Sequence, residues 1–528
     1  MEKLQLQAHR GVCVEYPENT MSAYMGAVIQ GYKVIEIDPA VTVDGVFVCM
    51  HDKTINRTGR KNDGSIIEDE MLIADITYAE ADGYDYGLWF SNKFKGERIP
   101  KLEDVLDMAV EHNVLLKIDN KFRRFSDENI ERFFELTASY LNNVAFTCYD
   151  MDMVLRVISK FPDANIHYDG VVDDEILENL SKTVKSDKLT VWVPLECSLT
   201  SWVKVAFADA KLCEKIKKFA KLGVWILSEY EDLEIARSWG ADFVETNGKL
   251  KPCNLKGVRV DLHNHTKYSH DGMSEVADLC DAEVAAGNKI VAITDHYDVL
   301  RYDTVDHKTQ FENIKDNIKE ISPLYKDKLE ILYGIEVGEG VWYPDVTDEF
   351  IHQYDFDVVI GSVHSVRTPK TNVPFSGIDF SGYTYDDIME YMKCYFDDVE
   401  DMLNNTEMDV LAHLVSPLKY INGKYGKEIS SRIFEDRIVK VLEFIIKHGI
   451  ILEVNTSSIG SSYDEFMPEE WIIRRFREMG GYLISVASDS HCPSKAALGF
   501  DRAYETLKEI GFENVFYVKN RYIIQITL

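Results

Sequence analysis

Two histidines two positions apart follow a predicted strand in Val-Asp-Leu-His-Asn-His-Thr-Lys-Tyr-Ser-His-Asp-Gly, residues 260–272. Residues 258–262 alternate and contain enough β-branched side chains to predict a strand, on which residues two apart point to the same face. His263 and His265 should therefore converge on one place, with Asp271 following within a turn. Imidazoles with a nearby carboxylate are typical of a transition-metal site. A single pair of this kind is more often two exposed loop histidines.

Residue types that bind metals recur at the ends of apolar runs in the rest of this half of the chain. These residues are His296, Glu336, His364, His413, Asp489 and His491. Ten of the 14 histidines of the chain lie after residue 257. So many potential ligands at strand ends favour a metal centre over exposed loop histidines.

A second set of polar side chains lies at the ends of predicted strands in the first half of the chain. It comprises His9, Arg10, Glu36, Asp38, His51, Asp119 and Lys121. Three carboxylates among oxygen donors suit a hard cation such as Mg²⁺ or Ca²⁺. Two histidines beside a metal are a natural acid–base pair near neutral pH, and a guanidinium can hold a phosphate through two hydrogen bonds. Each residue alone also fits a structural role, such as a salt bridge at a barrel rim or a cap.

The chain of 528 residues is strongly acidic, with 58 Lys and Arg against 90 Asp and Glu and a formal net charge of −32. This charge repels nucleic acid and anionic lipid, so we expect small substrates and neither of those partners. Nine cysteines without a Cys-x-x-Cys pair fit a reducing compartment. We find no signal-peptide core and no run of about 18–20 apolar residues, so a cytoplasmic protein is expected. The oligomeric state stays unknown from the sequence.

The elements that must position both sets alternate between apolar strand-like runs and amphipathic helical ones, which predicts βα units around parallel strands. Eight runs in the first half lie near residues 4–8, 33–38, 114–119, 143–148, 164–168, 189–195, 223–227 and 242–245. Seven in the second half lie near 258–263, 289–294, 330–336, 357–362, 409–413, 449–454 and 481–487. Asp44-Gly45 predicts a hairpin after the second run. The polar stretch 247–257 separates halves of about 250 residues, the size of one (β/α) barrel.

Several motifs accumulate in the first half: His9-Arg-Gly, Tyr16-Pro-Glu-Asn-Thr20, Glu36-Ile-Asp38, His51-Asp52, Gly96-Glu-Arg-Ile-Pro-Lys-Leu-Glu-Asp-Val105 and Gly240-Ala-Asp-Phe-Val-Glu-Thr-Asn247. Together they resemble the glycerophosphodiester phosphodiesterase family over residues 1–252. The resemblance implies a (β/α)₈ TIM barrel with His9 and His51 in acid–base catalysis. It also implies Glu36, Asp38 and Asp119 as metal ligands and Arg10 and Lys121 as phosphate contacts. The family usually has Glu at position 119, and the shorter Asp reaches less far.

The motifs of the second half are His263-Asn-His265, Thr294-Asp-His296, Ile360-Gly-Ser-Val-His364, Ala412-His-Leu414, Leu452-Glu-Val-Asn-Thr456 and Ser488-Asp-Ser-His491. They resemble the polymerase and histidinol phosphatase (PHP) family, most of all its histidinol phosphatase branch, from about residue 257 to 528. The resemblance implies a distorted (β/α)₇ barrel around two or three Zn²⁺, Mn²⁺ or Fe²⁺ ions. Its implied ligands are His263, His265, Asp271, His296, Glu336, His364, His413, Asp489 and His491, with Glu336 as the bridging carboxylate.

Three more residues in this half have open assignments. His270, beside Asp271, is expected to be a surface neighbour of the metal site. Arg367 and Lys419 are candidate phosphate contacts, and each fits a solvated rim charge equally well.

The sequence therefore predicts an α/β protein of two barrels, a TIM barrel in residues 1–252 and a PHP domain in residues 253–528. Its expected function is that of a bifunctional metal-dependent hydrolase of small phosphate esters. The first barrel would split a glycerophosphodiester, and the second would dephosphorylate a small alcohol, with histidinol phosphate as the leading candidate. A monoester made at the first site could feed the second.

Two alternatives stay open. In one, the second half is a nuclease or polymerase-associated module, which the charge of −32 opposes. In the other, only the PHP half is active, and the first barrel, with its Asp119, is a binding or regulatory module.

Overall fold

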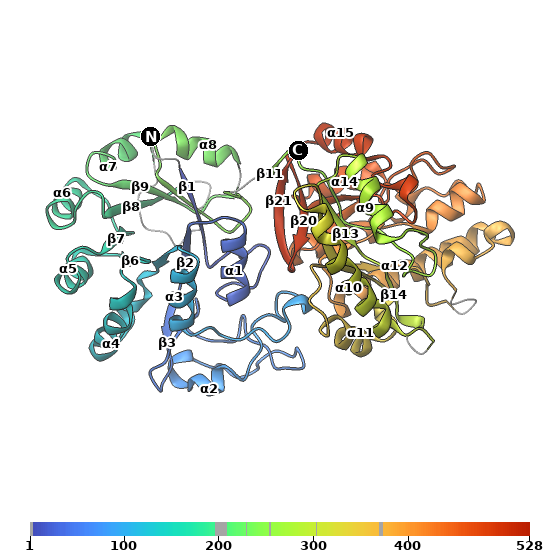
Figure 1. The fold of residues 1–528 in the computed structure, drawn as a ribbon. Helices are drawn as coiled ribbons and strands as arrows, with labels where there is room; N and C mark the ends of the chain where they lie inside the picture. The colour runs from blue at the N-terminus through green and yellow to red at the C-terminus, as the bar shows by residue number, and fades with distance from the viewer. Residues whose placement is uncertain (1–3, 196–208, 229, 253–254, 302–303, 369–372) are drawn as a thin grey trace. The chain divides into compact units, whose positions relative to one another are not determined.

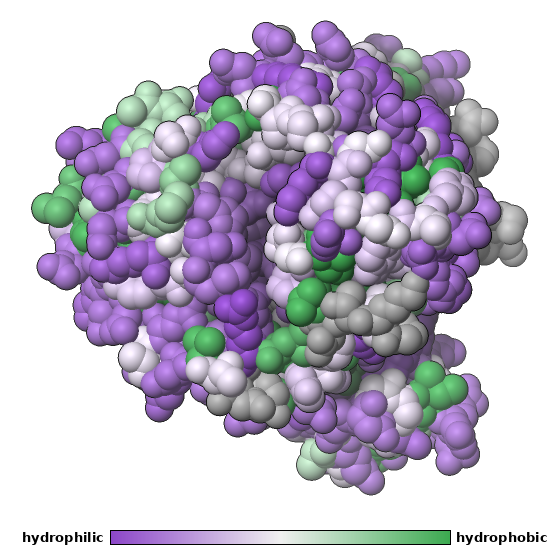
Figure 2. Space-filling view, turned by 90° about the vertical axis from the view of Figure 1, so that its right-hand side faces the viewer, coloured by the Kyte–Doolittle hydropathy of each residue, from purple (hydrophilic) through white to green (hydrophobic). Residues whose placement is uncertain are grey.

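The structure, a computed structural model, describes residues 4–195, 209–228, 230–252, 255–301, 304–368 and 373–528. It divides into two compact units, Met1–Cys253 and Asn254–Leu528. The face shown in Figure 2 is mostly hydrophilic, with apolar residues in small separate groups. Among the described residues, no helix combines the length and the apolar composition needed to cross a membrane.

Eight parallel strands close into a barrel in the first unit (Figure 1). They are β1 (Gln5–Ala8), β2 (Val34–Ile37), β5 (Leu115–Ile118), β6 (Val144–Cys148), β7 (Asn165–Tyr168), β8 (Leu189–Pro194), β9 (Lys221–Trp225) and β10 (Phe243–Thr246). The barrel closes because β1 pairs with both β2 and β10. The predicted (β/α)₈ barrel is confirmed, since each of the eight apolar runs forms one of these strands.

Helices surround this barrel (Figure 1). They are α1 (Met21–Ile29), α3 (Leu102–Glu111), α4 (Asp127–Thr137), α5 (Met151–Lys160), α6 (Asp174–Thr183), α7 (Ala210–Ile216) and α8 (Tyr230–Ser238), with the short α2 (Tyr78–Ala81) in a loop. Thr20, Ser126, Asp150, Asp173 and Asp209 begin five of them, each with a side-chain oxygen that accepts a backbone N–H of the first turn. These caps satisfy donors that the helix itself leaves unpaired and so fix where each helix begins.

The predicted hairpin at Asp44-Gly45 is confirmed. It joins the antiparallel strands β3 (Pro39–Val41) and β4 (Phe47–Cys49), and Gly45 has a φ of +78° that a residue with a side chain rarely adopts. The N–H of Met50 donates to the carbonyl oxygen of Asp38 at 2.8 Å. The hairpin thereby brings His51, the next residue, back beside the end of β2.

Seven parallel strands form the main sheet of the second unit. In spatial order they are β12 (Val260–Asp261), β13 (Ile290–Ile293), β15 (Glu330–Gly338), β16 (Val358–Ser362), β17 (Val410–Leu411), β18 (Ile451–Asn455) and β19 (Ile484–Ala487). The two outer strands meet through a parallel bridge between Asn264 and Ser490, where the His265 N–H donates to the Ser490 carbonyl at 2.8 Å. This arrangement confirms the predicted seven-stranded distorted barrel.

Helices again cover the outside of the barrel (Figure 1). They are α9 (Val276–Ala285), α10 (His307–Tyr325), α11 (Pro344–Ile351), α12 (Tyr385–Asn405), α13 (Glu435–His448), α14 (Glu470–Glu478) and α15 (Phe500–Ile510). The core between helices and strands is a single large apolar cluster that includes Val291, Ile335, Ile360 and Leu452.

Two features of the second unit were not predicted. A short strand, β14 (His296–Asp298), extends the sheet by pairing with the second half of β15. A further sheet combines β11 (Leu255–Lys256) with the antiparallel pair β20 (Asn514–Lys519) and β21 (Tyr522–Thr527). Asn520 and Arg521 form the turn of that pair with φ values of +49° and +66°, as a two-residue hairpin loop requires.

Candidate functional site

The residues with metal-binding side chains in the second unit come from the carboxyl ends of different strands, where a (β/α) barrel collects its functional groups. His263 and His265 follow β12, His296 begins β14, Glu336 lies in β15, His364 follows β16, His413 follows β17, and Asp489 and His491 follow β19. Asp271 lies in the loop between β12 and α9. The fold brings all nine of these predicted residues into one cluster.

Glu336 is the centre of the cluster and is completely buried. Its Oε1 lies 3.0 Å from Nε2 of His413 and 3.3 Å from Nε2 of both His263 and His364. Its Oε2 lies 2.7 Å from Nδ1 of His296 and 3.5 Å from Nε2 of His265. One carboxylate thus faces five imidazoles, with both of its oxygens engaged.

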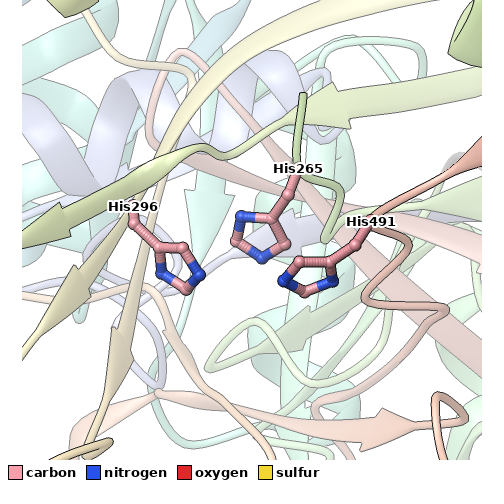
Figure 3. A group of neighbouring side chains, drawn as sticks. All are labelled: His265, His296 and His491. Carbon is pink, nitrogen blue, oxygen red and sulfur yellow. The ribbon is translucent and has the colours of Figure 1, made fainter. Parts of the chain in front are cut away.

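The imidazoles of His265, His296 and His491 gather close together (Figure 3). The ring centres of His265 and His296 are 4.1 Å apart, and those of His265 and His491 are 4.3 Å apart. Asp271 lies 3.5 Å from Nε2 of His296 and 3.3 Å from Nε2 of His491. Asp489 Oδ1 is 3.3 Å from Nε2 of His265. Several overlapping groups of three residues have ligand atoms within 4.8 Å of one another, so more than one group in the cluster could hold an ion.

Buried polar atoms without a hydrogen-bond partner show that these residues fit a metal. Nε2 of His263, Nε2 of His265, Nδ1 of His296 and Oε2 of Glu336 are all buried, and although they lie close to one another, none makes a hydrogen bond of good geometry. Such atoms carry a desolvation cost unless something binds them. Neutral imidazoles mixed with carboxylates are the ligands preferred by Zn²⁺, Mn²⁺ and Fe²⁺.

The charged groups of the cluster shift one another's pKa values. Burial by itself raises the pKa of Glu336, but His263, His364 and His296 hold it well below its ordinary value. Burial lowers the pKa of His263, and the charges of Glu336 and Glu453 more than offset this and hold it well above the usual range. Glu336 is therefore anionic at neutral pH, which favours a cation at its oxygens.

Glu453 contacts two of the histidines, His263 and His413. Its Oε1 lies 2.7 Å from Nδ1 of His263, and its Oε2 accepts the backbone N–H of His413 at 2.8 Å. The contact fixes the His263 ring so that Nε2 points to Glu336. Carboxylates commonly orient metal-binding histidines in this way.

The cluster opens into a cavity of about 250 Å³. His270, Asp298 and Lys419 line this cavity together with six of the nine candidate ligand residues. The side chain of His270 is 40% exposed. Its Nδ1 lies 3.4 Å from Oδ2 of Asp298, so the ring faces the site.

In the first unit, Asp38 at the end of β2 is the centre of the charged residues. Arg10 Nε lies 3.3 Å from Asp38 Oδ2, Lys121 forms an ion pair with Asp38 Oδ1, and the Arg10 N–H donates to Glu36 Oε2 at 3.0 Å. Asp119 Oδ1 lies 3.8 Å from Lys121 Nζ. Burial raises the pKa of Asp38, but Lys121 and Arg10 hold it well below its ordinary value. Five of the seven predicted residues of this half therefore meet directly.

The remaining two residues are histidines with fixed orientations. Nδ1 of His9 lies 2.7 Å from Oδ1 of Asn247, and burial lowers the pKa of this histidine. Nδ1 of His51 lies 2.6 Å from Oδ1 of Asp52. In each case the contact occupies Nδ1 and leaves Nε2 as the nitrogen available for proton transfer.

Comparison with known families accounts for both arrangements. Residues 9–166 match the glycerophosphoryl diester phosphodiesterase family, and residues 261–457 match the PHP domain. The chain joins one domain from each of these families. Both families are phosphoric ester hydrolases, so the chain belongs to that class of enzyme.

Similar curated proteins cover one unit each. The PHP half is 29% identical over 266 residues to a probable histidinol-phosphatase of Clostridium acetobutylicum, a match of 49% of this chain and 96% of that protein. The phosphodiesterase half is 37% identical over 114 residues to a glycerophosphodiester phosphodiesterase of Caldanaerobacter subterraneus. That match spans 22% of this chain and 44% of the relative.

Solved structures resemble each unit as well. Histidinol phosphate phosphatase of Lactococcus lactis, complexed with Zn, L-histidinol and phosphate, is 22% identical with a TM-score of 0.42 and covers 50% of this chain and 98% of its own. An Oleispira antarctica phosphodiesterase in complex with sn-glycerol-3-phosphate is 20% identical with a TM-score of 0.38 and covers 46% of this chain and 93% of its own.

The two candidate phosphate contacts of the PHP domain differ in position. Lys419 lines the cavity, and its Nζ donates to Ser457 Oγ at 3.0 Å. Arg367 instead pairs with Asp398 and Asp401 of α12, both at 2.5 Å, and does not line the cavity.

Sequence reasoning missed several residues of both sites. In the phosphodiesterase domain, buried Glu245 accepts from Lys117 Nζ at 2.8 Å and lies 4.0 Å from Nε2 of His9. Glu245 and Asn247 are two positions apart where β10 ends, so the same alternation that selected Glu36 and Asp38 could have found them. In the PHP domain, Glu453 lies within the motif Leu452-Glu-Val-Asn-Thr456 but was given no role.

Proposed function

We propose that the chain is a bifunctional enzyme, with a glycerophosphodiester phosphodiesterase in residues 1–252 and a phosphomonoesterase of the histidinol phosphatase type in residues 253–528. The buried Glu336 with its five histidines, three of which line a cavity, is the observation that carries the proposal. Five imidazoles converging on one buried carboxylate would be costly without cations.

In the PHP domain, two or three Zn²⁺, Mn²⁺ or Fe²⁺ ions would supply a hydroxide nucleophile at neutral pH and relieve charge on the phosphoryl oxygens. Glu336, Asp271, Asp489 and the histidines would hold them. Glu453 keeps His263 aligned, and Lys419 contributes a positive charge to the cavity wall. The substrates are small phosphate monoesters, with histidinol phosphate and glycerol phosphate as the candidates to compare.

In the phosphodiesterase domain, Glu36, Asp38 and Asp119 would hold a single hard cation, Mg²⁺ or Ca²⁺. Arg10 and Lys121 already lie beside Asp38 and would turn to the diester phosphate when the carboxylate binds metal. His9 and His51 would serve as base and acid, because each has Nδ1 engaged and Nε2 free for a proton. The products would be an alcohol and glycerol phosphate.

An assay panel on the purified full chain tests this proposal. Glycerophosphocholine and other glycerophosphodiesters should be hydrolysed with added Mg²⁺ or Ca²⁺, and a phosphate monoester should be hydrolysed in the same preparation. Elemental analysis should find at least two transition-metal ions per chain. Absence of diester hydrolysis together with monoester hydrolysis would reduce the first domain to a binding or regulatory role. Absence of both would reject the proposal.

A further inference from the structure

The part of the PHP cavity wall that is not formed by the histidine cluster comes from loops that follow different strands. Phe375 and Pro374 follow β16, Lys419 and Tyr420 follow β17, Ser457 follows β18, and Lys495 follows β19. Because the cluster would bind the phosphate, this wall is what contacts the alcohol part of a monoester. Its chemistry therefore decides which alcohols the site accepts.

All the acidic side chains that line the cavity, among the described residues, are already engaged with the cluster. They are Asp271, Asp298 and Asp489. Asp271 contacts His491 at 3.3 Å, Asp298 contacts His270 at 3.4 Å, and Asp489 contacts His265 at 3.3 Å. The rest of the wall offers hydroxyls, apolar surface and lysines, and its described residues include no carboxylate.

The two lysines give that wall a positive charge. Lys419 Nζ has the neutral Ser457 Oγ as its hydrogen-bond partner, and neither Lys419 nor Lys495 forms an ion pair with a described residue. Burial lowers the pKa of Lys419, the charge of Asp489 opposes this, and Lys495 lowers it further. The two ammonium groups are thus close enough to repel each other, and a third cation between them would face the same repulsion.

We infer that this cavity selects phosphate monoesters whose alcohol part carries no positive charge, such as a neutral polyol, and disfavours those with an ammonium group. The inference deepens the proposed phosphatase function and rests on it. In the hydrolysis, water supplies the oxygen of the new P–O bond, the P–O bond to the alcohol breaks, and the alcohol leaves with a proton. An ammonium in the alcohol part would lose water at a wall whose described residues include lysines and no free carboxylate, which lowers its affinity.

A reaction that yields a phosphorylated neutral polyol would match this preference. Hydrolysis of a glycerophosphodiester, the activity proposed for the first domain, releases such a product. Histidinol phosphate carries an α-ammonium group and is the disfavoured type.

A matched substrate pair tests the inference on the full chain. Glycerol 1-phosphate and 2-amino-3-hydroxypropyl phosphate differ only in a hydroxyl replaced by an ammonium. The kcat/KM for the hydroxyl compound should exceed that for the ammonium compound by about 10- to 100-fold, the scale on which like charges in a partly desolvated site discriminate. Histidinol phosphate should follow the ammonium compound. Equal values, or a preference for either ammonium compound, overturn the inference.

A variant pair assigns the effect to the cavity wall. Lys495 is exposed, so Lys495→Glu should fold normally and should move the ratio of the two kcat/KM values at least several-fold toward the ammonium compound. Lys508→Glu changes the net charge by the same amount on exposed α15 and should leave the ratio unchanged. An equal shift in both variants would mean that overall charge, not this wall, sets the ratio.

A binding measurement can test the preference of the cavity independently of the proposed phosphatase activity. Calorimetric titration of the full chain with each ester, after a chelator has removed the metal ions that hydrolysis needs, measures the preference without turnover. If glycerol 1-phosphate binds preferentially but no monoester is hydrolysed, the phosphatase function is rejected and the preference of the cavity stands. If monoesters are hydrolysed but the two esters bind equally and react equally, the phosphatase stands and the inference is rejected.

Discussion

The two carboxylate oxygens of Glu336 each face more than one imidazole nitrogen at distances of 2.7–3.5 Å. A glutamine in its place would keep the shape and remove the charge that makes the site attractive to cations. In the phosphodiesterase domain, Asp38 is the corresponding buried carboxylate, and it pairs with the side chains of Arg10 and Lys121. At the scale of single residues, both sites are therefore defined by a buried carboxylate whose negative charge is retained by its neighbours.

Asp119→Glu tests the third carboxylate of the phosphodiesterase domain. The longer side chain should restore reach and lower the Mg²⁺ concentration for half-maximal diester hydrolysis by a factor on the order of 10, the scale of metal-site substitutions. Asp119 also accepts the Lys121 N–H at 3.1 Å, so Tm should be measured alongside to detect loss of that contact. Asp163→Glu, on an exposed ion pair with Lys185, is the control. An unchanged metal dependence with normal Tm would remove Asp119 from the site.

At the scale of elements, a buried acid pair lies where β12 and β19 meet. Asp261 in β12 accepts the backbone N–H of Ser488 at 3.0 Å, which ties the two outer strands of the PHP barrel together. Glu283 in α9 is completely buried behind it, and Asn288 donates to its other oxygen. Oε1 of Glu283 and Oδ2 of Asp261 are both without another partner. Because Asp261 raises the pKa of Glu283, we expect the two carboxyl groups to share one proton, which would satisfy both atoms.

This shared proton makes the stability of the PHP domain depend on pH. Burial raises the pKa of Glu283 from 4.5 to about 9, and Asp261 adds to the rise. A carboxyl group with a raised folded-state pKa stabilises the fold fully below its unfolded-state pKa, and that stability is lost as pH rises through the folded-state value. The free energy of unfolding should therefore fall between pH 4.5 and about 9. The loss should be about 1 kcal/mol or more, since one pKa unit corresponds to about 1.4 kcal/mol.

Glu283→Gln tests this link, because the amide keeps a donor toward Asp261 without titrating. Thermal unfolding of the full chain at pH 5, 7 and 9 should show a smaller decline of the PHP transition in the variant than in the unmodified protein. Glu505→Gln, exposed on α15, removes an equal charge from the surface and should keep the decline. Identical pH profiles for all three proteins would contradict the shared proton.

At the scale of the whole molecule, each unit contains a complete candidate site of its own. The contacts of Glu336 lie within Asn254–Leu528, and those of Asp38 lie within Met1–Cys253. The two activities should therefore separate by mutation of the full chain, although they reside in one polypeptide.

His9→Ala or His51→Ala should lower diester hydrolysis by about 10²- to 10⁴-fold, the usual cost of losing an acid–base group, and leave monoester hydrolysis intact. His263→Ala combined with His265→Ala should do the reverse and reduce the bound transition metal, because two ligands are removed. The untouched activity in each variant reports that the protein is folded. Loss of diester hydrolysis in a folded His263→Ala/His265→Ala protein would contradict two independent sites.

The sequence by itself determined the two barrels, because long apolar runs become strands wherever helices can cover them. It also placed the ligand-type residues at strand ends, and the Asp44-Gly45 turn, since these are local properties of the chain. Only the tertiary structure decided which distant residues meet. Glu453 orients His263 across 190 positions, and Arg367 turns to Asp398 while Lys419 faces the cavity. Strand order and closure set those distances, and neither is encoded in local pattern.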